Sequence, residues 1–267
     1  MDAPRPKPSP LGYRDDGPPD APVVVFGPSL GTTLGLFEPQ LALAQQFRVI
    51  RHDLRGHGGS AVPPGPYTIG EMAADVVALL DDLGVDRFSY VGVSIGGAIA
   101  QWLGVHEPGR VESLVICSSA ARFHDPAGWP DRAARVRTDG TGFLLESRCG
   151  AWYTPEFAQR EPATAEWLLD MLRTVPREGY AGSCEAIGQF DLRSRLSEIT
   201  VPTTVIAGAE DPATPADMVR AIATGIGDAR FVLVPGTSHL VNVERPDIVN
   251  AEITRQVLAA TSAGREG

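Results

Sequence analysis

The segment 92–96, Gly-Val-Ser-Ile-Gly, constrains this chain more than any other. It follows a β-rich run, residues 88–91, and opens onto an apolar, helix-like stretch. A serine between two such glycines, at a turn from strand to helix, is the nucleophile-elbow arrangement. The turn forces Ser94 into a sparsely allowed backbone conformation, and a bulky residue at 92 or 96 would clash with the backbone. We therefore expect an exposed Ser94 hydroxyl, with the Ile95 N–H pointing to where an oxyanion would form.

An acid and a histidine follow this serine in the order that hydrolases of this kind use. Asp211 comes just after the strand-like run 203–208, and His239 just after the run 231–234. Loops past the carboxyl ends of parallel strands share one edge of a sheet, where ligands bind. Taken alone, His239 would be interpreted as a histidine of a surface loop. Together with Ser94 and Asp211 it predicts a catalytic triad.

Strand and helix patterns alternate along much of the chain. The β-branched run 23–26 is typical of a strand buried on both faces. The run 48–53 is a second strand candidate, and 111–117 is the strand expected after the elbow helix. Thr68 and Glu71 have the spacing of a capping box that opens a helix through Leu83. This alternation predicts an α/β fold, with a mostly parallel central sheet and helices on both faces. A small edge hairpin is expected within 11–22, and a final helix within 246–259.

The alternation fails between residues 121 and 189, which are rich in Arg, Glu, Ala and Trp. We interpret this stretch as several short helices that form a cap above the catalytic edge. The predicted organisation is a core made of 1–120 and 190–267, with the helical cap 121–189 inserted into it. The tail, residues 262–267, is expected to be disordered.

The charge and the cysteine content of the chain exclude some classes of binding partner. The net charge of −10 in 267 residues argues against nucleic acid and gives no basic surface for a membrane. Cys117, Cys149 and Cys184 fit neither a closed disulfide set nor a zinc spacing, so we expect a reducing compartment, no metal and no cofactor. Residues 1–10 lack the apolar region of a secretory signal, and no run approaches the ~18 apolar residues of a membrane span. These features predict a cytoplasmic protein, and they leave open whether it is a monomer or a homo-oligomer.

Further short segments stand out besides the elbow. They are Ser-Leu-Gly-Thr at 29–32, Arg-Gly-His-Gly at 55–58, Trp-Tyr-Thr-Pro at 152–155, Gly-Tyr at 179–180, Asp-Pro-Ala-Thr-Pro at 211–215 and His-Leu-Val-Asn-Val-Glu at 239–244. With these segments the chain resembles one family within the α/β-hydrolase superfamily, the 3-oxoadipate enol-lactonases of bacterial aromatic catabolism. The resemblance runs from about residue 13 to residue 258. One departure is Thr237-Ser238 ahead of the histidine, which we interpret as tuning that loop.

The resemblance implies a role for each matching residue. Ser94 would be the nucleophile, His239 the general base and then acid, and Asp211 the group that orients His239. The backbone N–H groups of Leu30 and Ile95 would form the oxyanion hole. The implied reaction opens 3-oxoadipate enol-lactone to 3-oxoadipate through an acyl-enzyme on Ser94.

The implied substrate is a small anionic lactone, and its carboxylate needs a basic partner in this acidic protein. The segment Trp-Pro-Asp-Arg at 129–132 is similar to a Trp-x-x-Arg segment of the family's cap. Arg132 would then bind the carboxylate and Trp129 would form an apolar wall. Trp152 is a further substrate-binding candidate, with core packing as its alternative. The alternative for Arg132, with Arg135 and Arg137, is the solvated face of a cap helix.

Two other functions remain open at this point. One is a carboxylesterase or methylesterase of the same fold that acts on another small ester. The other is a ligand receptor that reuses a hydrolase pocket. The remaining histidines have no partner pattern and are expected to be structural or on the surface; they are His52, His57, His106 and His124.

Overall fold

A computed structural model describes residues 8–263 of the chain. Residues 1–7 and 264–267 lie outside the described part, and with them most of the predicted N-terminal segment and C-terminal tail. The tail prediction is wrong for residues 262 and 263, which belong to the last helix, α9 (Pro246–Ala263).

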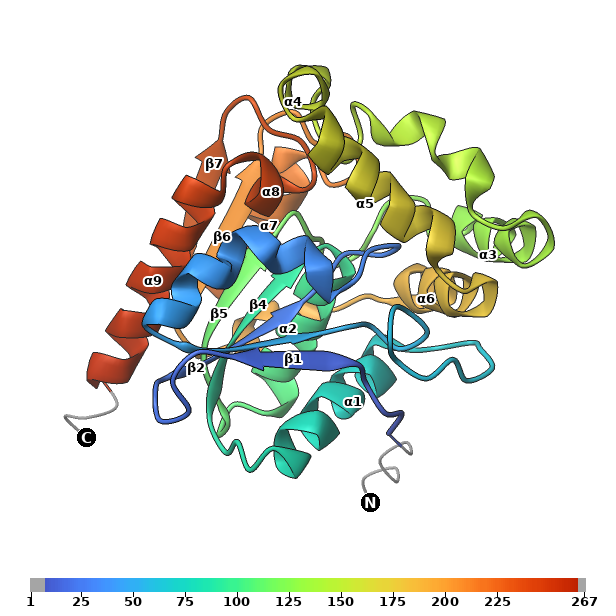
Figure 1. The fold of residues 1–267 in the computed structure, drawn as a ribbon. Coiled ribbons are helices and arrows are strands. Elements are labelled where there is room, and N and C mark those ends of the chain that lie inside the picture. The colour runs from blue at the N-terminus through green and yellow to red at the C-terminus, as the bar shows by residue number, and fades with distance from the viewer. Residues whose placement is uncertain (1–7, 264–267) are drawn as a thin grey trace.

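Within residues 8–263, seven strands form one sheet in the order β1-β3-β2-β4-β5-β6-β7 (Figure 1). Their bounds are β1 Tyr13–Asp16, β2 Val23–Gly27, β3 Arg48–His52, β4 Phe88–Val93, β5 Val111–Cys117, β6 Thr203–Gly208 and β7 Arg230–Val234. All neighbours run parallel except β1, which pairs antiparallel with β3. The mostly parallel sheet is confirmed. The edge hairpin is wrong, because β1 pairs with β3 and not with β2, the next strand along the chain.

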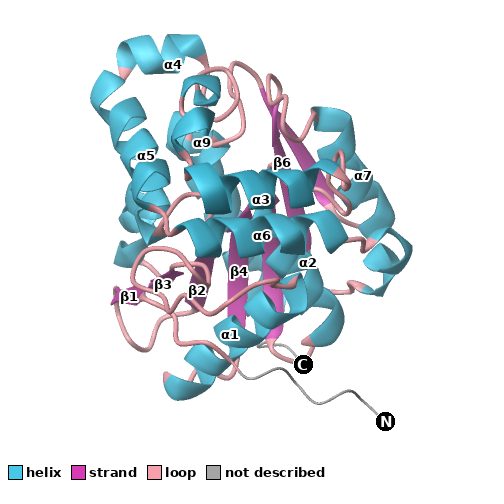
Figure 2. Ribbon diagram, turned by 90° about the vertical axis from the view of Figure 1, so that its right-hand side faces the viewer, coloured by secondary structure: helices cyan, strands magenta, loops and turns pink. Residues whose placement is uncertain are grey.

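Helices cover both faces of this sheet (Figures 1 and 2). One face carries α1 (Ile69–Asp82), α2 (Ile95–His106), α7 (Ala216–Ile226) and a short 3-10 helix, Arg193–Glu198. The other face carries α9, the short α8 (Val241–Glu244) and a 3-10 segment, Leu34–Gln45. The predicted capping box is present at the start of α1, where Thr68 and Glu71 bond each other's backbone N–H groups. The predicted α/β class, with helices on both faces of the sheet, is confirmed.

The chain between β5 and β6 is helical and lies above the carboxyl end of the sheet (Figure 1). Its elements are α3 Gly128–Asp139, the 3-10 turns Gly142–Leu144 and Glu146–Arg148, α4 Pro155–Arg160, α5 Pro162–Thr174 and α6 Arg177–Gln189. We keep the division into a core and a cap, residues 121–189, as a proposal. The backbone of α6 touches the loop after β3, because a Cβ on Gly179 would overlap the carbonyl oxygen of Gly56.

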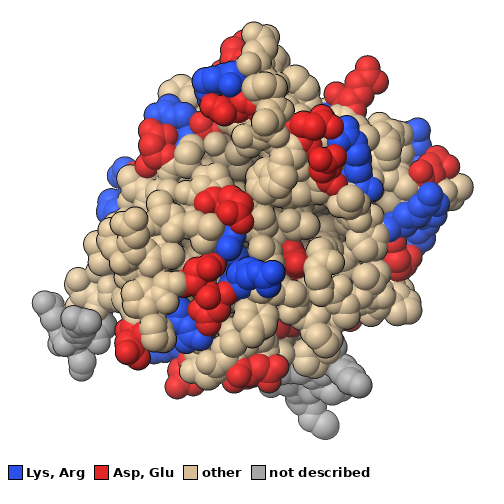
Figure 3. Space-filling view, in the orientation of Figure 1, with Lys and Arg blue, Asp and Glu red and all other residues tan. Residues whose placement is uncertain are grey.

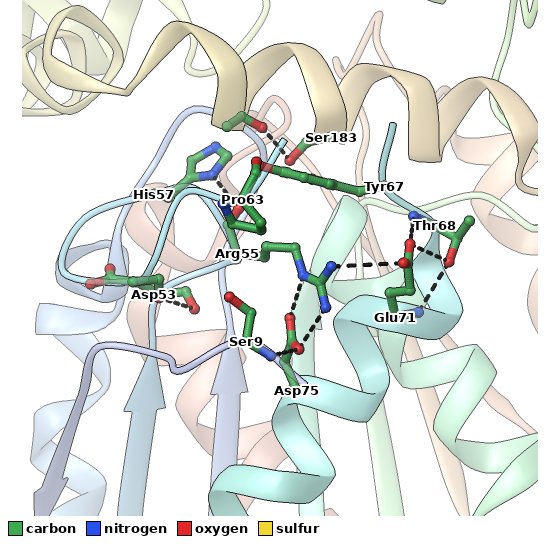
Figure 4. A network of polar contacts seen from close by, with 12 residues as sticks. Ser9, Asp53, Arg55, His57, Pro63, Tyr67, Thr68, Glu71, Asp75 and Ser183 are labelled. Atoms are coloured by element: carbon green, nitrogen blue, oxygen red, sulfur yellow. Dashed lines mark hydrogen bonds and ion pairs between the residues drawn. The ribbon is translucent and has the colours of Figure 1, made fainter. Parts of the chain in front are cut away.

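The loop after β3 is also anchored to α1. Figure 4 shows the Arg55 guanidinium between two acidic side chains of that helix. Arg55 bonds both carboxylate oxygens of Asp75 at 2.7 Å and lies 3.8 Å from Glu71. Its guanidinium also stands over the ring of Tyr67, 5.5 Å from the centroid. A forked, buried pair of this kind fixes the course of the loop backbone as well as the side chain.

Charges of both signs lie side by side on the face drawn in Figure 3. At the β1 edge, Arg48 pairs with Asp15 at 2.7 Å, and Arg51 pairs with Asp16 at 3.0 Å and with Glu38 at 2.9 Å. Basic groups there are thus largely neutralised by neighbours. In the part of the chain that the structure describes, no helix is both long and apolar enough to cross a membrane.

Two buried histidines should make the fold sensitive to acid. Burial lowers the pKa of His52 and of His57 from 6.5 to about 4, and the carbonyls of Asp53 and Arg55 oppose only part of this. Between these pH values the unfolded chain binds more protons than the folded chain. The free energy of unfolding should therefore fall on acidification through this window, by up to about 1.4 kcal/mol per pH unit for each histidine.

Denaturant unfolding at pH 6.5 and 5 measures this slope. Replacing His52 by glutamine should remove about half of it. A free energy of unfolding that stays constant between these pH values would contradict the prediction.

Candidate active site

The turn at Ser94 has the strain that the sequence predicted. Ser94 joins β4 to α2 with φ 58° and ψ −114°, outside the regions open to most residues. A Cβ on Gly92 would overlap the carbonyl of Gly96, and a Cβ on Gly96 would overlap the carbonyl of Gly27. Both glycines are therefore required by the backbone, and the serine stands at the carboxyl edge of the sheet.

Asp211 and His239 meet across the loops that follow β6 and β7. His239 Nδ1 lies 2.7 Å from Asp211 Oδ2. The same carboxylate accepts from the N–H groups of Ala213 and Thr214, at 2.8 and 3.0 Å, and from the Thr214 hydroxyl at 2.6 Å. Burial by itself would raise the pKa of Asp211, but the attraction of His239 and these hydrogen bonds outweigh it and lower the pKa. An ionised Asp211 thus accepts from Nδ1–H and leaves Nε2 as the basic nitrogen of the ring.

Ser94 and His239 line one cavity of about 270 Å³. The other predicted residues on its wall are Leu30, Trp129, Arg132 and Trp152. Asp211 is not on the wall but bonds three residues that are, His239, Ala213 and Thr214. Ile95 is fully buried at the start of α2. The fold therefore brings the predicted residues to one place.

Two backbone donors remain free near Ser94. Within residues 8–263, the N–H groups of Leu30 and Ile95 donate to no other residue. Ile95 is the first residue of α2, where helix N–H groups have no partner inside the helix. Leu30 stands in the turn after β2, next to Gly31 with φ 80°. Because buried N–H groups are almost always satisfied, two free ones beside a serine are suited to an anionic oxygen.

Two guanidinium groups line the same cavity. Arg132 stands over the ring of Trp129, 4.6 Å from the centroid, and Arg148 stands over Trp152 at 5.4 Å. Neither arginine has a carboxylate within ion-pair distance in the described part of the chain. Burial lowers the pKa of Arg148, and the positive charge of nearby Arg132 lowers it further. The pocket thus holds two guanidinium groups that no carboxylate of the described residues pairs with, while Asp125 is an acidic residue on the same wall.

The other two arginines of α3 behave differently. Arg135 is exposed and pairs with Asp139 at 3.5 Å. Arg137 bonds Glu178 at 2.8 Å and Glu185 at 2.6 Å, which ties α3 to α6. The solvated-face alternative therefore describes Arg135 and not Arg132.

Some lining residues were not predicted. His124 is exposed, as expected of a surface histidine, and it also lines the cavity together with Phe123 and Tyr180, which was not predicted. Nothing in the sequence around His124 marks it, because its position depends on how the chain between β5 and α3 folds over the sheet. Trp152 is packed in the core, with 3% of its surface exposed, and it also lines the cavity. Core packing and a place at the substrate pocket are therefore compatible for this residue. No cluster of His, Cys, Asp and Glu suited to a metal ion occurs among the described residues.

Comparison with known proteins gives the class. Residues 24–252 match the model of the Alpha/beta hydrolase family, which is most of the chain. This chain belongs to the alpha/beta hydrolase family.

Three relatives narrow the similarity. 3-Oxoadipate enol-lactonase 2 of Acinetobacter baylyi is 36% identical over 241 residues, 90% of each chain. The crystal structure of the enol-lactonase from Burkholderia xenovorans LB400 superposes with a TM-score of 0.91 at 38% identity, covering 94% of this chain and 97% of that one. A protein of Variovorax paradoxus with a provisional name as a carbamate hydrolase is 31% identical, covering 95% of this chain and 98% of its own. The family and these likenesses support hydrolase activity.

Proposed function

We propose that this chain is a serine hydrolase that opens 3-oxoadipate enol-lactone to 3-oxoadipate. The observation that carries the proposal is the shared cavity, in which Ser94 and His239 face two guanidinium groups that lack a carboxylate partner. The likeness to enol-lactonases supports the same substrate. A cytoplasmic location and a place in aromatic catabolism belong to this proposal.

The proposed chemistry is acyl transfer through Ser94. His239 Nε2 takes the hydroxyl proton as Ser94 Oγ attacks the lactone carbonyl, and Asp211 stabilises the imidazolium. The N–H groups of Leu30 and Ile95 bind the oxyanion. The ring C–O bond then breaks, and His239 returns the proton to the departing enol oxygen. Water, activated by the same histidine, releases the acyl group as a new carboxylate.

Arg132 and Arg148 give the pocket a local charge opposite to that of the whole protein. With a net charge of −10, the protein repels an anion in general. Two uncompensated guanidinium groups at the cavity reverse this effect locally, since each can bind a carboxylate through paired N–H donors. The substrate's free carboxylate is therefore assigned to this pair, with Trp129 and Trp152 as the apolar walls.

Replacing Arg132 by alanine should lower kcat/KM for the enol-lactone about ten- to a hundredfold. A charge-assisted pair is worth roughly 1.5–3 kcal/mol, which corresponds to that factor. Hydrolysis of neutral p-nitrophenyl acetate should hardly change, because this ester has no carboxylate. Steady-state kinetics of both substrates on the purified variant measure the two effects. Arg135→Ala, on the same helix but paired with Asp139, is the matched control and should leave both rates unchanged.

Equal losses on both substrates would show that Arg132 supports the shape of the pocket. No loss on either would assign the carboxylate to Arg148, and Arg148→Ala would then give the selective loss.

The other candidate is hydrolysis of a different small ester or a carbamate by the same residues, in line with the carbamate-hydrolase name of one relative. Turnover of the enol-lactone no faster than that of p-nitrophenyl acetate would favour it. A ligand receptor would hydrolyse neither the enol-lactone nor p-nitrophenyl acetate, while its melting temperature would still change when ligand is added.

A further inference from the structure

The turn 29–32 carries one of the two proposed oxyanion donors, yet it has little internal support. It follows β2 and holds itself through one acceptor, the carbonyl of Ser29. The N–H and the hydroxyl of Thr32 donate to that oxygen at 3.1 and 2.8 Å. Gly31 has φ 80°, as the third residue of such a turn requires. The direction of the Leu30 N–H therefore depends on what holds the Leu30–Gly31 peptide from outside.

His57 supplies that outside contact. The Gly31 N–H donates to His57 Nε2 at 3.2 Å, in the interior of the protein. The other ring nitrogen, Nδ1, lies 3.2 Å from the carbonyl oxygen of Arg55. A carbonyl can only accept and a backbone N–H can only donate, so the two partners define a neutral ring with its proton on Nδ1. Burial, which lowers the pKa of His57 to about 4, keeps this form at neutral pH.

The ring is itself held in place. Its acceptor partner belongs to Arg55, whose side chain is forked onto Asp75 of α1 (Figure 4). From the same loop, Asp53 Oδ1 accepts the N–H of Leu34 at 2.7 Å, just beyond the turn. The loop after β3 thus contacts the turn region at two points and is fixed to α1 by a buried ion pair.

We propose that His57 is a positioning residue, which holds the Gly31 peptide through Nε2. The Leu30 N–H then points at the oxyanion that forms when Ser94 attacks the substrate carbonyl. The inference rests on the proposed function and adds a residue to it. His57 touches no reacting atom, since it is buried behind the turn and is absent from the cavity wall.

A loss of this contact should act on the transition state and not on substrate binding. The oxyanion exists only during the reaction, so a displaced donor lowers kcat and leaves KM unchanged. Removal of an oxyanion donor costs about 10²–10³ in kcat, so partial misalignment should cost on the order of ten- to a hundredfold.

The test compares His57→Leu with His57→Gln. Both variants lose the ring and its bond to the Arg55 carbonyl, but only glutamine can place an oxygen where Nε2 accepts the Gly31 N–H. For p-nitrophenyl acetate, His57→Leu should lose ten- to a hundredfold in kcat with KM unchanged, and His57→Gln should recover most of that loss. Hydrogen exchange of the Gly31 amide should quicken in the leucine variant and stay slow in the glutamine variant.

A control separates positioning from stability. Tyr90→Phe removes the hydroxyl that bonds His52 Nε2 at 3.0 Å, a buried histidine contact between β4 and β3, on either side of β2. It should lower the melting temperature and leave kcat unchanged.

Several outcomes would overturn the proposal. Equal kcat for His57→Leu and the wild type would do so, as would equal losses in the leucine and glutamine variants or a change confined to KM. A wild-type protein that cleaves neither ester nor lactone would instead refute the proposed function. The exchange of the Gly31 amide would still report whether His57 holds the turn.

Discussion

Replacing Ser94 by alanine should lower kcat by on the order of 10⁴-fold or more and leave the fold intact. The hydroxyl forms the covalent acyl-enzyme, and no other hydroxyl-bearing residue on the described cavity wall has a positive φ. Alanine keeps a Cβ at the strained position, so the elbow itself should persist. Steady-state kinetics on the enol-lactone, with circular dichroism and a melting curve, measure activity and fold separately.

Ser89→Ala is the matched control, since Ser89 lies on the same strand and bonds Ser113 at 2.9 Å away from the cavity. It should keep its rate. A folded Ser94→Ala protein with more than about a tenth of the wild-type rate would show that Ser94 is not the nucleophile.

Replacing Asp211 by asparagine should lower kcat by about 10³- to 10⁴-fold. The carboxylate accepts from His239 Nδ1, and its lowered pKa keeps it ionised at neutral pH. An asparagine can present an N–H to Nδ1, which would shift the ring proton to Nε2 and remove the base that Ser94 needs. KM should change little, because Asp211 is not on the cavity wall.

Asp217→Asn, an exposed acid in the first turn of the nearby α7, removes a charge of the same sign and should leave kcat unchanged. A loss of less than tenfold in the Asp211 variant would mean that another group orients His239.

Local patterns were enough to predict the sheet and the place of the proposed triad. Each parallel strand was found from a short β-branched or apolar run, and a strand buried on both faces, such as β2, needs apolar side chains throughout. The α1 cap was visible because Thr68 and Glu71 stand three residues apart and bond each other's backbone N–H groups. The partner of β1 was not visible, since pairing with β3 is a contact between distant segments that leaves no mark on residues 13–16.

The site was harder to predict where backbone atoms are the partners. His57 binds a carbonyl and an N–H, which every residue has, so its sequence neighbours carry no sign of the contact. Arg148 was only a second choice to Arg132, because its place in the pocket depends on two 3-10 turns after α3. The roles of Ser94, Asp211 and His239 stay predictions until the variants are measured.

The contact between Gly56 and Gly179 limits how such a chain can diverge. A side chain at Gly56 or at Gly179 would push α6 away from the loop after β3. Single substitutions at these two positions therefore cannot be accepted without loss of the contact. Arg132 and Arg148 stand on other elements and bear none of that contact. Selection for a substrate with a different acyl group can therefore replace the residues of the pocket wall one at a time. The contact between the two glycines meanwhile keeps α6 in the same position relative to the catalytic edge of the sheet.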